Sequence, residues 1–314
     1  MATVYTKSVE IVEVAPRDGL QNEKVQVPTD MKLDLINRAI DAGARRVEVT
    51  SFVNPKAVPQ MADAEAVCAG LPERGDVTYI GLVMNQRGAD RALATGRIDQ
   101  LGAVCVATDT FAMRNQGQTS DGSVEAAKAI IETAKAAGKT AQATIAASFG
   151  CPFEGEVQDA RVIAMAAALV EAGPVEIALA DTIGVGNPAH VTRLVEGVKE
   201  VVGDIPIRMH FHNTRGTGLA NVWAAIEAGA STIDASIGGL GGCPFAPGAA
   251  GNVATEDVVY MLERAGIDTG LDLTKLIETN AWLVPIMGKE LPAMVAKSGG
   301  FPIAQSQEEE EELA

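Results

Sequence analysis

The sequence is poor in cysteine, and the few cysteines it has are far apart. Cys68, Cys105, Cys151 and Cys243 are the only four among 314 residues, and no two of them form a CxxC pair. Domains held together by disulfides are small and dense in cysteine. We therefore interpret these residues as reduced thiols of a cytoplasmic protein.

Basic residues and long apolar runs are also scarce. Lys and Arg number 25 against 41 Asp and Glu, which gives a formal net charge of −16. Nucleic acids and anionic membranes bind over faces rich in clustered Lys and Arg, so we exclude both as partners. The N-terminal stretch MATVYTKSVEIVEV lacks the apolar run of a signal peptide or a membrane span.

Small aliphatic residues are abundant instead. Hydrophobic residues make up 47% of the chain, although aromatic residues contribute only 4%. A composition rich in Ala, Val, Ile and Gly is typical of buried parallel strands under closely packed helices. The length suits a single α/β barrel or two ordinary domains.

One unit recurs along the chain. The stretch AIDAGARRVEVTSF (39–52) resembles AIEAGASTIDASIG (225–238), and looser copies occupy 134–149 and 169–182. Each copy reads as an amphipathic helix that ends in glycine and is followed at once by a short apolar run. Glycine readily takes the left-handed conformation that ends a helix. Repetition of helix, glycine and strand predicts right-handed βαβ units and a parallel sheet.

Eight apolar runs with strand character predict a (β/α)8 TIM barrel. They lie near 9–15, 46–52, 77–84, 100–107, 140–148, 175–181, 205–212 and 231–237. An open doubly wound sheet is the alternative, but no GxGxxG follows the first strand.

The C-terminal part of the chain is expected to add helices to this barrel. The stretch TGLDLTKLIETNAWLVPIMG reads as helical. We assign residues 1–290 to a barrel catalytic domain and 291–314 to an extension. Its end, QSQEEEEELA, is expected to be a disordered, solvated acidic tail.

Two of the three histidines, His210 and His212, lie in the pentapeptide MHFHN. A strand has a side-chain period of two, so both imidazoles point to the same side. This pair, at a predicted strand end, favours metal ligation over a structural role. His190, at a helix start, is interpreted as structural.

Other polar residues also lie at the expected strand ends, where the chemistry of a TIM barrel takes place. They are Arg17, Asp18, Gln21, Glu48, Asp181, Asn213, Cys243 and Asn252. Each taken alone has a structural interpretation, such as a local ion pair. Several buried ionisable groups that converge need one another or a metal ion, which favours function.

Four of these residues provide a mixed nitrogen and oxygen ligand set. Two imidazoles, from His210 and His212, join the Asp18 carboxylate and the Asn252 amide oxygen. Oxygen ligands without thiolate favour Mg²⁺ or Mn²⁺. Zn²⁺ stays an alternative, because two histidines and a carboxylate also suit it.

Residues 238–251 hold six glycines and two prolines in fourteen positions. Such a loop can approach a ligand closely and move. Cys243 lies in this loop. It is either a small packing residue or a thiol that delivers a proton beside the site, and we favour the second interpretation.

At these motifs the sequence resembles the 3-hydroxy-3-methylglutaryl-CoA lyase family, within the DRE-TIM metallolyase superfamily. The resemblance runs from about residue 8 to about residue 290. Its motifs are RDGLQNE, GCPFEGEV, DTIGVG, HFH and GGLGGCPFAPGAAGNVATEDVVYMLE. The last is the most specific, since RDG and HxH also occur in Claisen-condensing relatives such as the isopropylmalate and homocitrate synthases.

The resemblance implies an enzyme that cleaves the C2–C3 bond of an acyl-CoA with a tertiary hydroxyl at C3. The products would be acetyl-CoA and a ketoacid, which is acetoacetate if the substrate is 3-hydroxy-3-methylglutaryl-CoA. It also implies a divalent metal held by Asp18, His210, His212 and Asn252. The base that takes the hydroxyl proton stays open among Asp18, His210 and a metal-bound water.

The resemblance further implies roles for five residues. Arg17 would hold the enolate oxygen, and Cys243 would handle the proton of the enolate carbon. Glu48 and Asp181 would position Arg17, the metal waters or the substrate carboxylate. Gln21 would contact the substrate.

The stretch HFHNTRG departs from the usual family pattern, in which an acid and an aromatic residue follow the histidines. Asn213 replaces the acid and Arg215 replaces the aromatic. Arg215 is expected to bind a substrate carboxylate or a CoA phosphate, or else to pair with a surface acid.

Several alternatives stay open at this point. The substrate could be a different acyl-CoA, of the isohexenylglutaryl or citramalyl type. A Claisen-condensing synthase, a ketoacid aldolase that needs no CoA, and an acyl-CoA-binding barrel without turnover are the rival functions. The oligomeric state is also open, with a homodimer as one option.

Overall fold

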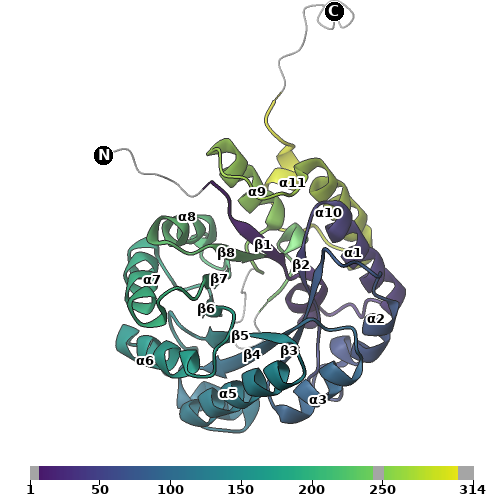
Figure 1. Cartoon of the computed structure of the whole chain (residues 1–314). Helices are drawn as coiled ribbons and strands as arrows, with labels where there is room; N and C mark the ends of the chain where they lie inside the picture. The colour runs from purple at the N-terminus through teal and green to yellow at the C-terminus, as the bar shows by residue number, and fades with distance from the viewer. Residues whose placement is uncertain (1–6, 243–250, 303–314) are drawn as a thin grey trace, which may run out of the picture.

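The computed structural model describes residues 7–242 and 251–302 and forms a closed barrel of eight strands. All neighbouring strands pair in parallel, and β1 pairs with β8 to close the ring. Figure 1 shows the strands at the centre and the helices arranged around them. The predicted TIM barrel is confirmed.

The eight strands fall within or at the edges of the predicted runs. They are β1 Glu10–Glu13, β2 Arg46–Ser51, β3 Thr78–Val83, β4 Gln100–Val106, β5 Thr140–Ala146, β6 Ile177–Asp181, β7 Ile207–Phe211 and β8 Thr232–Ala235. The α-helices are α1 Thr29–Asp41, α2 Ala64–Gly70, α3 Gln86–Ala94, α4 Asp109–Gln116, α5 Ser120–Ala136, α6 Asp159–Val170, α7 Pro188–Val202, α8 Gly218–Ala228, α9 Thr255–Arg264, α10 Leu273–Met287 and α11 Val295–Ser298. Short helical turns η1 Ala15–Gly19, η2 Pro59–Met61 and η3 Ile237–Gly239 follow β1, precede α2 and follow β8.

The glycines of the recurring unit end their helices as predicted. Gly43 after α1 has φ 109° and Gly229 after α8 has φ 105°. Both values lie in the left-handed region, where a side chain would be strained. At Gly43 a Cβ would also stand 2.2 Å from the Gly270 carbonyl oxygen. The chain therefore turns from helix into strand within two or three residues.

The main apolar core lies between the strands and the surrounding helices, whereas the barrel interior is largely polar. A single large cluster of buried aliphatic residues joins the outward faces of the strands to the helices. A separate small cluster holds only Val12, Val14 and Ile80. Charged side chains such as Arg208 and Glu48 are almost fully buried. Buried charges need partners, and those partners form the site described below.

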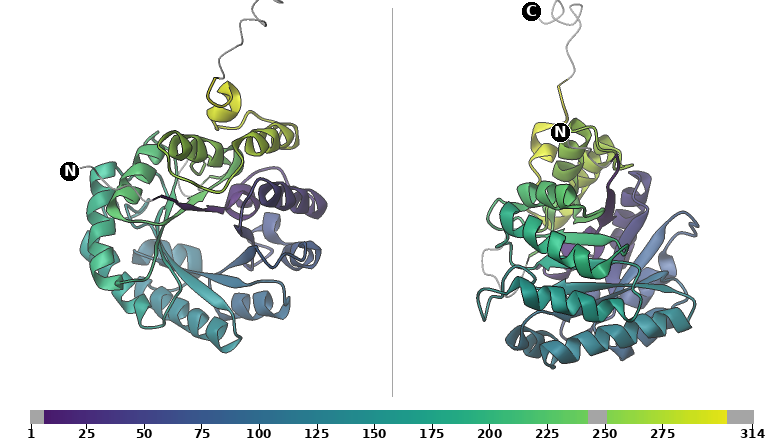
Figure 2. Two further views of the ribbon diagram at one scale, coloured as in Figure 1. Left: turned by 45° about the horizontal axis from the view of Figure 1, so that its top comes forward. Right: turned by 60° about the vertical axis from the view of Figure 1, so that its left-hand side comes forward.

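The helices that follow β8 pack together beside the barrel (Figures 1 and 2). α10 contacts α1, α9 and α11. The Asp257 carboxylate accepts hydrogen bonds from the backbone N–H groups of Met294 and Val295, at 3.1 and 2.7 Å. The described part of the expected extension is thereby attached to α9. The acidic tail, 305–314, lies outside the described residues. Among the described residues no helix is both long and apolar enough to cross a membrane.

Candidate metal and substrate site

The turn after β1 delivers Arg17 and Asp18 to the carboxyl end of the barrel. It is a short π-helical turn, a geometry frequent at functional sites. The Glu13 carboxylate holds its start by accepting the Ala15 N–H at 2.8 Å. Gly19 is needed because a Cβ there would stand 2.9 Å from Ser236 Oγ. The turn can therefore lie directly against the segment that follows β8.

The end of β7 delivers the two histidines. His210 and His212 point to the same side, with ring centroids 5.2 Å apart. Asn252 joins them through an antiparallel bridge between His212 and Asn252, supported by the Val253 N–H bond to the Phe211 carbonyl at 3.0 Å. Residues remote in sequence thus meet at one end of the barrel, as the sequence predicted.

Potential metal-ligand atoms of Asp18, His210 and His212 lie within 4.8 Å of one another. The Nε2 atoms of His210 and His212 are 3.8 and 3.7 Å from Oδ2 of Asp18. Asn252 lies beside them, since its Nδ2 donates to the same oxygen at 2.8 Å. Its Oδ1 is buried and has no hydrogen-bond partner among the described residues. An orphaned buried acceptor next to two imidazoles and a carboxylate fits a divalent cation.

His210 has a further partner on its other ring nitrogen. Its Nδ1 lies 3.0 Å from Oδ2 of Asp234, which stands opposite His210 in the register of β7 and β8. When a carboxylate accepts the Nδ1–H, Nε2 is left unprotonated, and its lone pair is available to a metal ion beside Asp18. This arrangement is the one expected for a metal-binding histidine.

Two carboxylates hold the Arg17 guanidinium. Its Nε pairs with Oε1 of Glu48, and its Nη1 pairs with Oδ1 of Asp18. Burial alone lowers the pKa of Arg17, but these two carboxylates outweigh it, so the pKa is raised. Arg17 is therefore a fixed cation whose orientation is set from two sides.

The Asp18 carboxylate is kept ionised. Burial alone raises its pKa, but Arg17, His212 and His210 bring the pKa well below its ordinary value. Asp234 behaves alike, because Arg208 and His210 outweigh burial and lower its pKa. Ionised carboxylates are what a metal ligand and its supporting group require.

A cavity of about 160 Å³ opens beside these groups. Its polar wall includes Arg17, Asp18, Glu48, His210 and His212, together with Gln21. Its opposite wall is mostly apolar and comes from β3, β4, β5, β6 and α4. The residues of that wall are Leu82, Met84, Val104, Val106, Phe111, Asn115, Thr144, Ala146, Ala180 and Thr182.

Asp181 and Arg215, two of the predicted site residues, do not line this cavity. Asp181 is fully buried and does not line it; its two oxygens accept the N–H groups of Val185 and Gly186, each at 2.9 Å. Burial raises the pKa of Asp181, although those bonds oppose the shift. Arg215 is exposed and donates to the Ile183 and Gly184 carbonyls at 3.0 and 2.9 Å. Cys243 lies outside the described residues.

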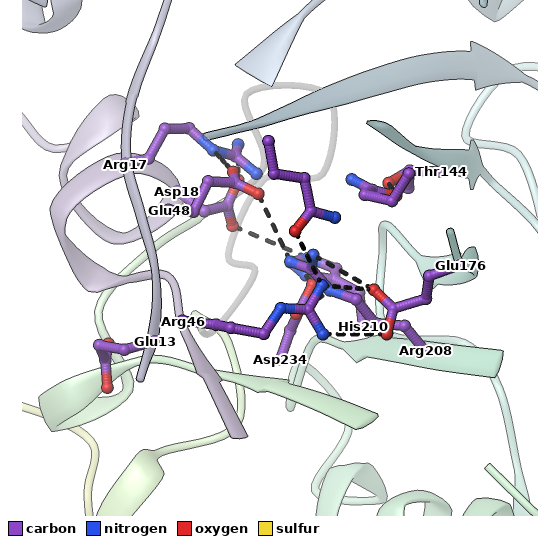
Figure 3. Close-up of polar contacts among 12 residues, drawn as sticks. Glu13, Arg17, Asp18, Arg46, Glu48, Thr144, Glu176, Arg208, His210 and Asp234 are labelled. Carbon is purple, nitrogen blue, oxygen red and sulfur yellow. Dashed lines mark hydrogen bonds and ion pairs between the residues drawn. The ribbon is translucent and has the colours of Figure 1, made fainter. Parts of the chain in front are cut away.

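Sequence reasoning missed two residues that support the site, Asp234 and Arg208. Arg208 pairs with Asp234 in the barrel interior, and Figure 3 shows both side chains next to His210. The signal was present in the stretch IRMHFH. A strand period of two places Arg208 on the same side as both histidines. Asp234, in the stretch TIDAS, is an ionisable residue inside a predicted buried strand, and such a residue needs a partner in the barrel.

A model of the HMGL-like family matches residues 8–283. Hydroxymethylglutaryl-CoA lyase YngG of Bacillus subtilis (strain 168) is 43% identical over 289 residues, which are 92% of this chain and 96% of that protein. The (R)-citramalyl-CoA lyase of Chloroflexus aurantiacus is 41% identical over 309 residues, which cover 93% of this chain and 95% of that enzyme.

Solved structures agree with this assignment. An HMG-CoA lyase from Acinetobacter baumannii, in complex with coenzyme A and 3-methylmalate, is 41% identical with a TM-score of 0.91. The match covers 96% of this chain and 98% of that one. The resemblance inferred from the motifs is confirmed. The chain belongs to the HMGL-like family and is a carbon–carbon lyase of the hydroxymethylglutaryl-CoA lyase type.

Proposed function

We propose that this protein is a metal-dependent lyase that cleaves the C2–C3 bond of 3-hydroxy-3-methylglutaryl-CoA or a similar tertiary 3-hydroxyacyl-CoA. Acetyl-CoA and a ketoacid are the products. The observation that carries the proposal is the meeting of Asp18, His210 and His212 in the same cavity as Arg17. That arrangement supports a divalent cation and a fixed guanidinium acting together on one small substrate.

Asp18, His210, His212 and Asn252 would hold the divalent metal, which we propose to be Mg²⁺ or Mn²⁺. When bound, such a cation lowers the pKa of a nearby hydroxyl, as it does for water. Two oxygen ligands and the absence of a thiolate among these four residues support a hard cation.

Arg17 would bind the oxygen of the thioester enolate that forms when the C2–C3 bond breaks. Its contacts with Glu48 and Asp18 use Nε and Nη1, whereas a guanidinium carries five N–H donors. The remaining donors can face a charge that develops in the cavity. Donors fixed in advance stabilise such a charge without reorganising during the reaction.

Two proton transfers complete the reaction. The C3 hydroxyl loses its proton, the electron pair of the C2–C3 bond moves to C2, and C2 then receives a proton. Asp18 and His210 both line the cavity. Asp18 would accept the first proton, directly or through water, because Nε2 of His210 is assigned to the metal and its Nδ1–H to Asp234. We assign the second transfer to Cys243 on the basis of the sequence alone.

Glu48 would position Arg17, and Asp181 would act indirectly, by shaping the loop after β6. Gln21 would contact the substrate, since it lines the cavity and accepts a hydrogen bond from Ser51 at 3.0 Å. Arg215 would bind a CoA phosphate at the rim, where its exposed position supports contact with the nucleotide end rather than the acyl group.

The apolar wall supports an acyl group with a small alkyl substituent at C3. Leu82, Val104 and Val106 line the same cavity as the polar groups. Thr182 provides a hydroxyl that can donate to the terminal carboxylate of the acyl chain, since its oxygen only accepts the Ala147 N–H, at 2.9 Å. These features fit both 3-hydroxy-3-methylglutaryl-CoA and a citramalyl-type thioester, the substrate class named for one relative.

A panel of CoA thioesters tests this function. Metal-loaded protein is incubated with 3-hydroxy-3-methylglutaryl-, citramalyl- and isohexenylglutaryl-CoA and with the free acids, and acetyl-CoA and ketoacid are quantified. We expect cleavage of a thioester and none of the free acids. Release of free CoA from acetyl-CoA plus a ketoacid would instead reveal a condensing synthase, and cleavage of a free acid would reveal an aldolase.

We also propose a cytoplasmic location. Cys68, Cys105 and Cys151 are all buried and unpaired, as expected in a reducing compartment. Burial raises the pKa of the Cys105 thiol to about 12 and that of Cys68 to about 11, which makes both unreactive.

A further inference from the structure

Arg208 lies in the interior of the barrel beneath the site, and its side chain is 1% exposed. Its Nε pairs with Oδ1 of Asp234, and its Nη2 lies 3.4 Å from Oε2 of Glu48. Nη1 is 3.9 Å from Glu176 but has no hydrogen-bond partner among the described residues. The guanidinium is therefore engaged mainly with two carboxylates that belong to the site.

Those two carboxylates support opposite sides of the site. Asp234 contacts Nδ1 of His210 at 3.0 Å, and Glu48 pairs with Nε of Arg17. Asp18 connects the two sides, since it pairs with Arg17 and faces His210. Figure 3 draws several of these contacts within the barrel. The contacts form a closed ring of Arg208, Asp234, His210, Asp18, Arg17 and Glu48.

We propose that Arg208 is a positioning residue that fixes the orientation of the metal-binding His210 relative to the catalytic Arg17. This inference rests on the proposed function, and it adds a residue that does not line the cavity. Arg208 acts through Asp234 on one side and through Glu48 on the other. A planar guanidinium can bind two carboxylates in fixed directions, which a single ammonium group cannot do.

The charges of the ring explain why a cation is needed at this position. Asp234 and Glu48 are both nearly inaccessible to solvent. Without Arg208, their negative charges would face each other across the barrel interior. Each carboxylate would then turn toward other hydrogen-bond donors. The His210 ring and the Arg17 guanidinium would no longer be held in a fixed orientation relative to each other.

Arg46 provides a matched control in the same barrel. It is also largely buried, and it pairs with Glu176 at 2.8 Å and with Glu10 at 2.7 Å. No described contact joins Arg46 to Asp234 or Glu48. Arg46 and Arg208 share Glu176, which lies 3.9 Å from Nη1 of Arg208. Loss of Arg46 should therefore perturb the barrel interior but leave Asp234 and Glu48 in contact with Arg208.

The test compares Arg208→Met with Arg46→Met in metal-free protein titrated with Mn²⁺, and free Mn²⁺ is followed by electron paramagnetic resonance. We expect Arg208→Met to weaken Mn²⁺ binding by about tenfold or more, as loss of groups that support a metal ligand does. Arg46→Met should bind Mn²⁺ like wild type. Circular dichroism and thermal unfolding report whether each variant is folded.

Two more variants keep the test decisive if Arg208→Met folds poorly. Arg208→Lys keeps the charge, and we expect it to fold while still binding Mn²⁺ more weakly than wild type. Asp234→Asn removes one of the two carboxylates. The Asp234→Asn/Arg208→Met double variant should weaken Mn²⁺ binding by less than the sum of the two single effects, because only the contact with Glu48 is then left to lose. Such non-additivity is the signature of two residues that act through one contact.

Equal Mn²⁺ affinity in wild type, Arg208→Lys and Arg46→Met would overturn the inference, and so would strictly additive effects in the double variant. The proposed function fails by a different result. In that case wild type itself does not bind Mn²⁺, or His210→Ala binds it as tightly as wild type does.

Discussion

Nδ2 of Asn252 lies 2.8 Å from Oδ2 of Asp18, although 234 positions separate these residues in the chain. The contact brings the loop after β8 onto the turn after β1, and Oδ1 of Asn252 is left buried without a hydrogen-bond partner among the described residues. An amide suits this position because a second carboxylate would repel Asp18.

Because of this contact, we expect the Tm of the Asn252→Asp variant to depend on bound metal more strongly than that of wild type. Two carboxylates this close repel each other in the metal-free protein, and a divalent cation relieves the repulsion. We expect the metal-free variant to have a lower Tm than wild type and to gain more Tm on addition of Mg²⁺. Scanning calorimetry with and without Mg²⁺ measures both. An identical Mg²⁺-induced rise in the two proteins would place the cation elsewhere.

Arg17→Gln should lower kcat much more than it raises KM. Loss of a donor to a developing oxyanion costs a factor of about 10²–10³ in kcat, since the donor acts mainly in the transition state. Steady-state kinetics with a cleaved thioester gives both constants. Arg114→Gln, on α4 over the Phe153 ring, is the control and should leave kcat near wild type. A rise in KM alone would show that Arg17 only binds substrate.

Glu256 predicts a loss of stability at alkaline pH. Burial is the main cause that raises its pKa from 4.5 to about 8. Because the folded pKa exceeds the unfolded one, its contribution to stability is complete below pH 4.5 and is lost as pH rises through 8. Each unit of pKa shift corresponds to about 1.4 kcal/mol. We expect the unfolding free energy of Glu256→Gln to fall less than that of wild type between pH 6 and pH 9.

Denaturant titrations at those two pH values measure this difference. Glu171→Gln changes an exposed acid and is the control, with the pH dependence of wild type expected. If Glu256→Gln and wild type lost the same free energy, Glu256 would be ionised in the folded protein throughout this range.

Asp181→Asn should destabilise the loop after β6. Its two oxygens accept the N–H groups of Val185 and Gly186, and an amide can accept only one of them. An unsatisfied buried N–H costs about 1–3 kcal/mol. We expect a lower unfolding free energy, faster hydrogen exchange at Val185 and Gly186, and slower turnover. Slower turnover with unchanged exchange would instead indicate a direct part for Asp181 in the chemistry.

The repeat and the strand runs predicted the fold because the local signals agree with the tertiary structure. Helix-ending glycines such as Gly43 and Gly229 mark where each strand begins, and apolar runs mark buried parallel strands. The pairing of His210 with His212 could likewise be predicted from strand period alone. The closeness of Asn252 to His212 was implied by the family motifs, since the bridge that creates it is tertiary.

Other features depend on three-dimensional register. Asp234 faces His210 because β7 and β8 pair at that level, and no local pattern reports a register between strands. Asp181 resembles a catalytic acid in sequence, but its oxygens are turned to the backbone of its own loop. Arg215 follows the histidines closely, yet the turn after β7 directs it to the Ile183 and Gly184 carbonyls.

The most direct test of the account is turnover before and after chelation, with His210→Ala measured in parallel. Protein stripped of metal is supplied with 3-hydroxy-3-methylglutaryl-CoA, and acetoacetate is measured before and after addition of Mg²⁺ or Mn²⁺. The account predicts no acetoacetate from the stripped protein, recovery with either ion, and little recovery in His210→Ala. Undiminished cleavage by the stripped protein, or full recovery in His210→Ala, would contradict it.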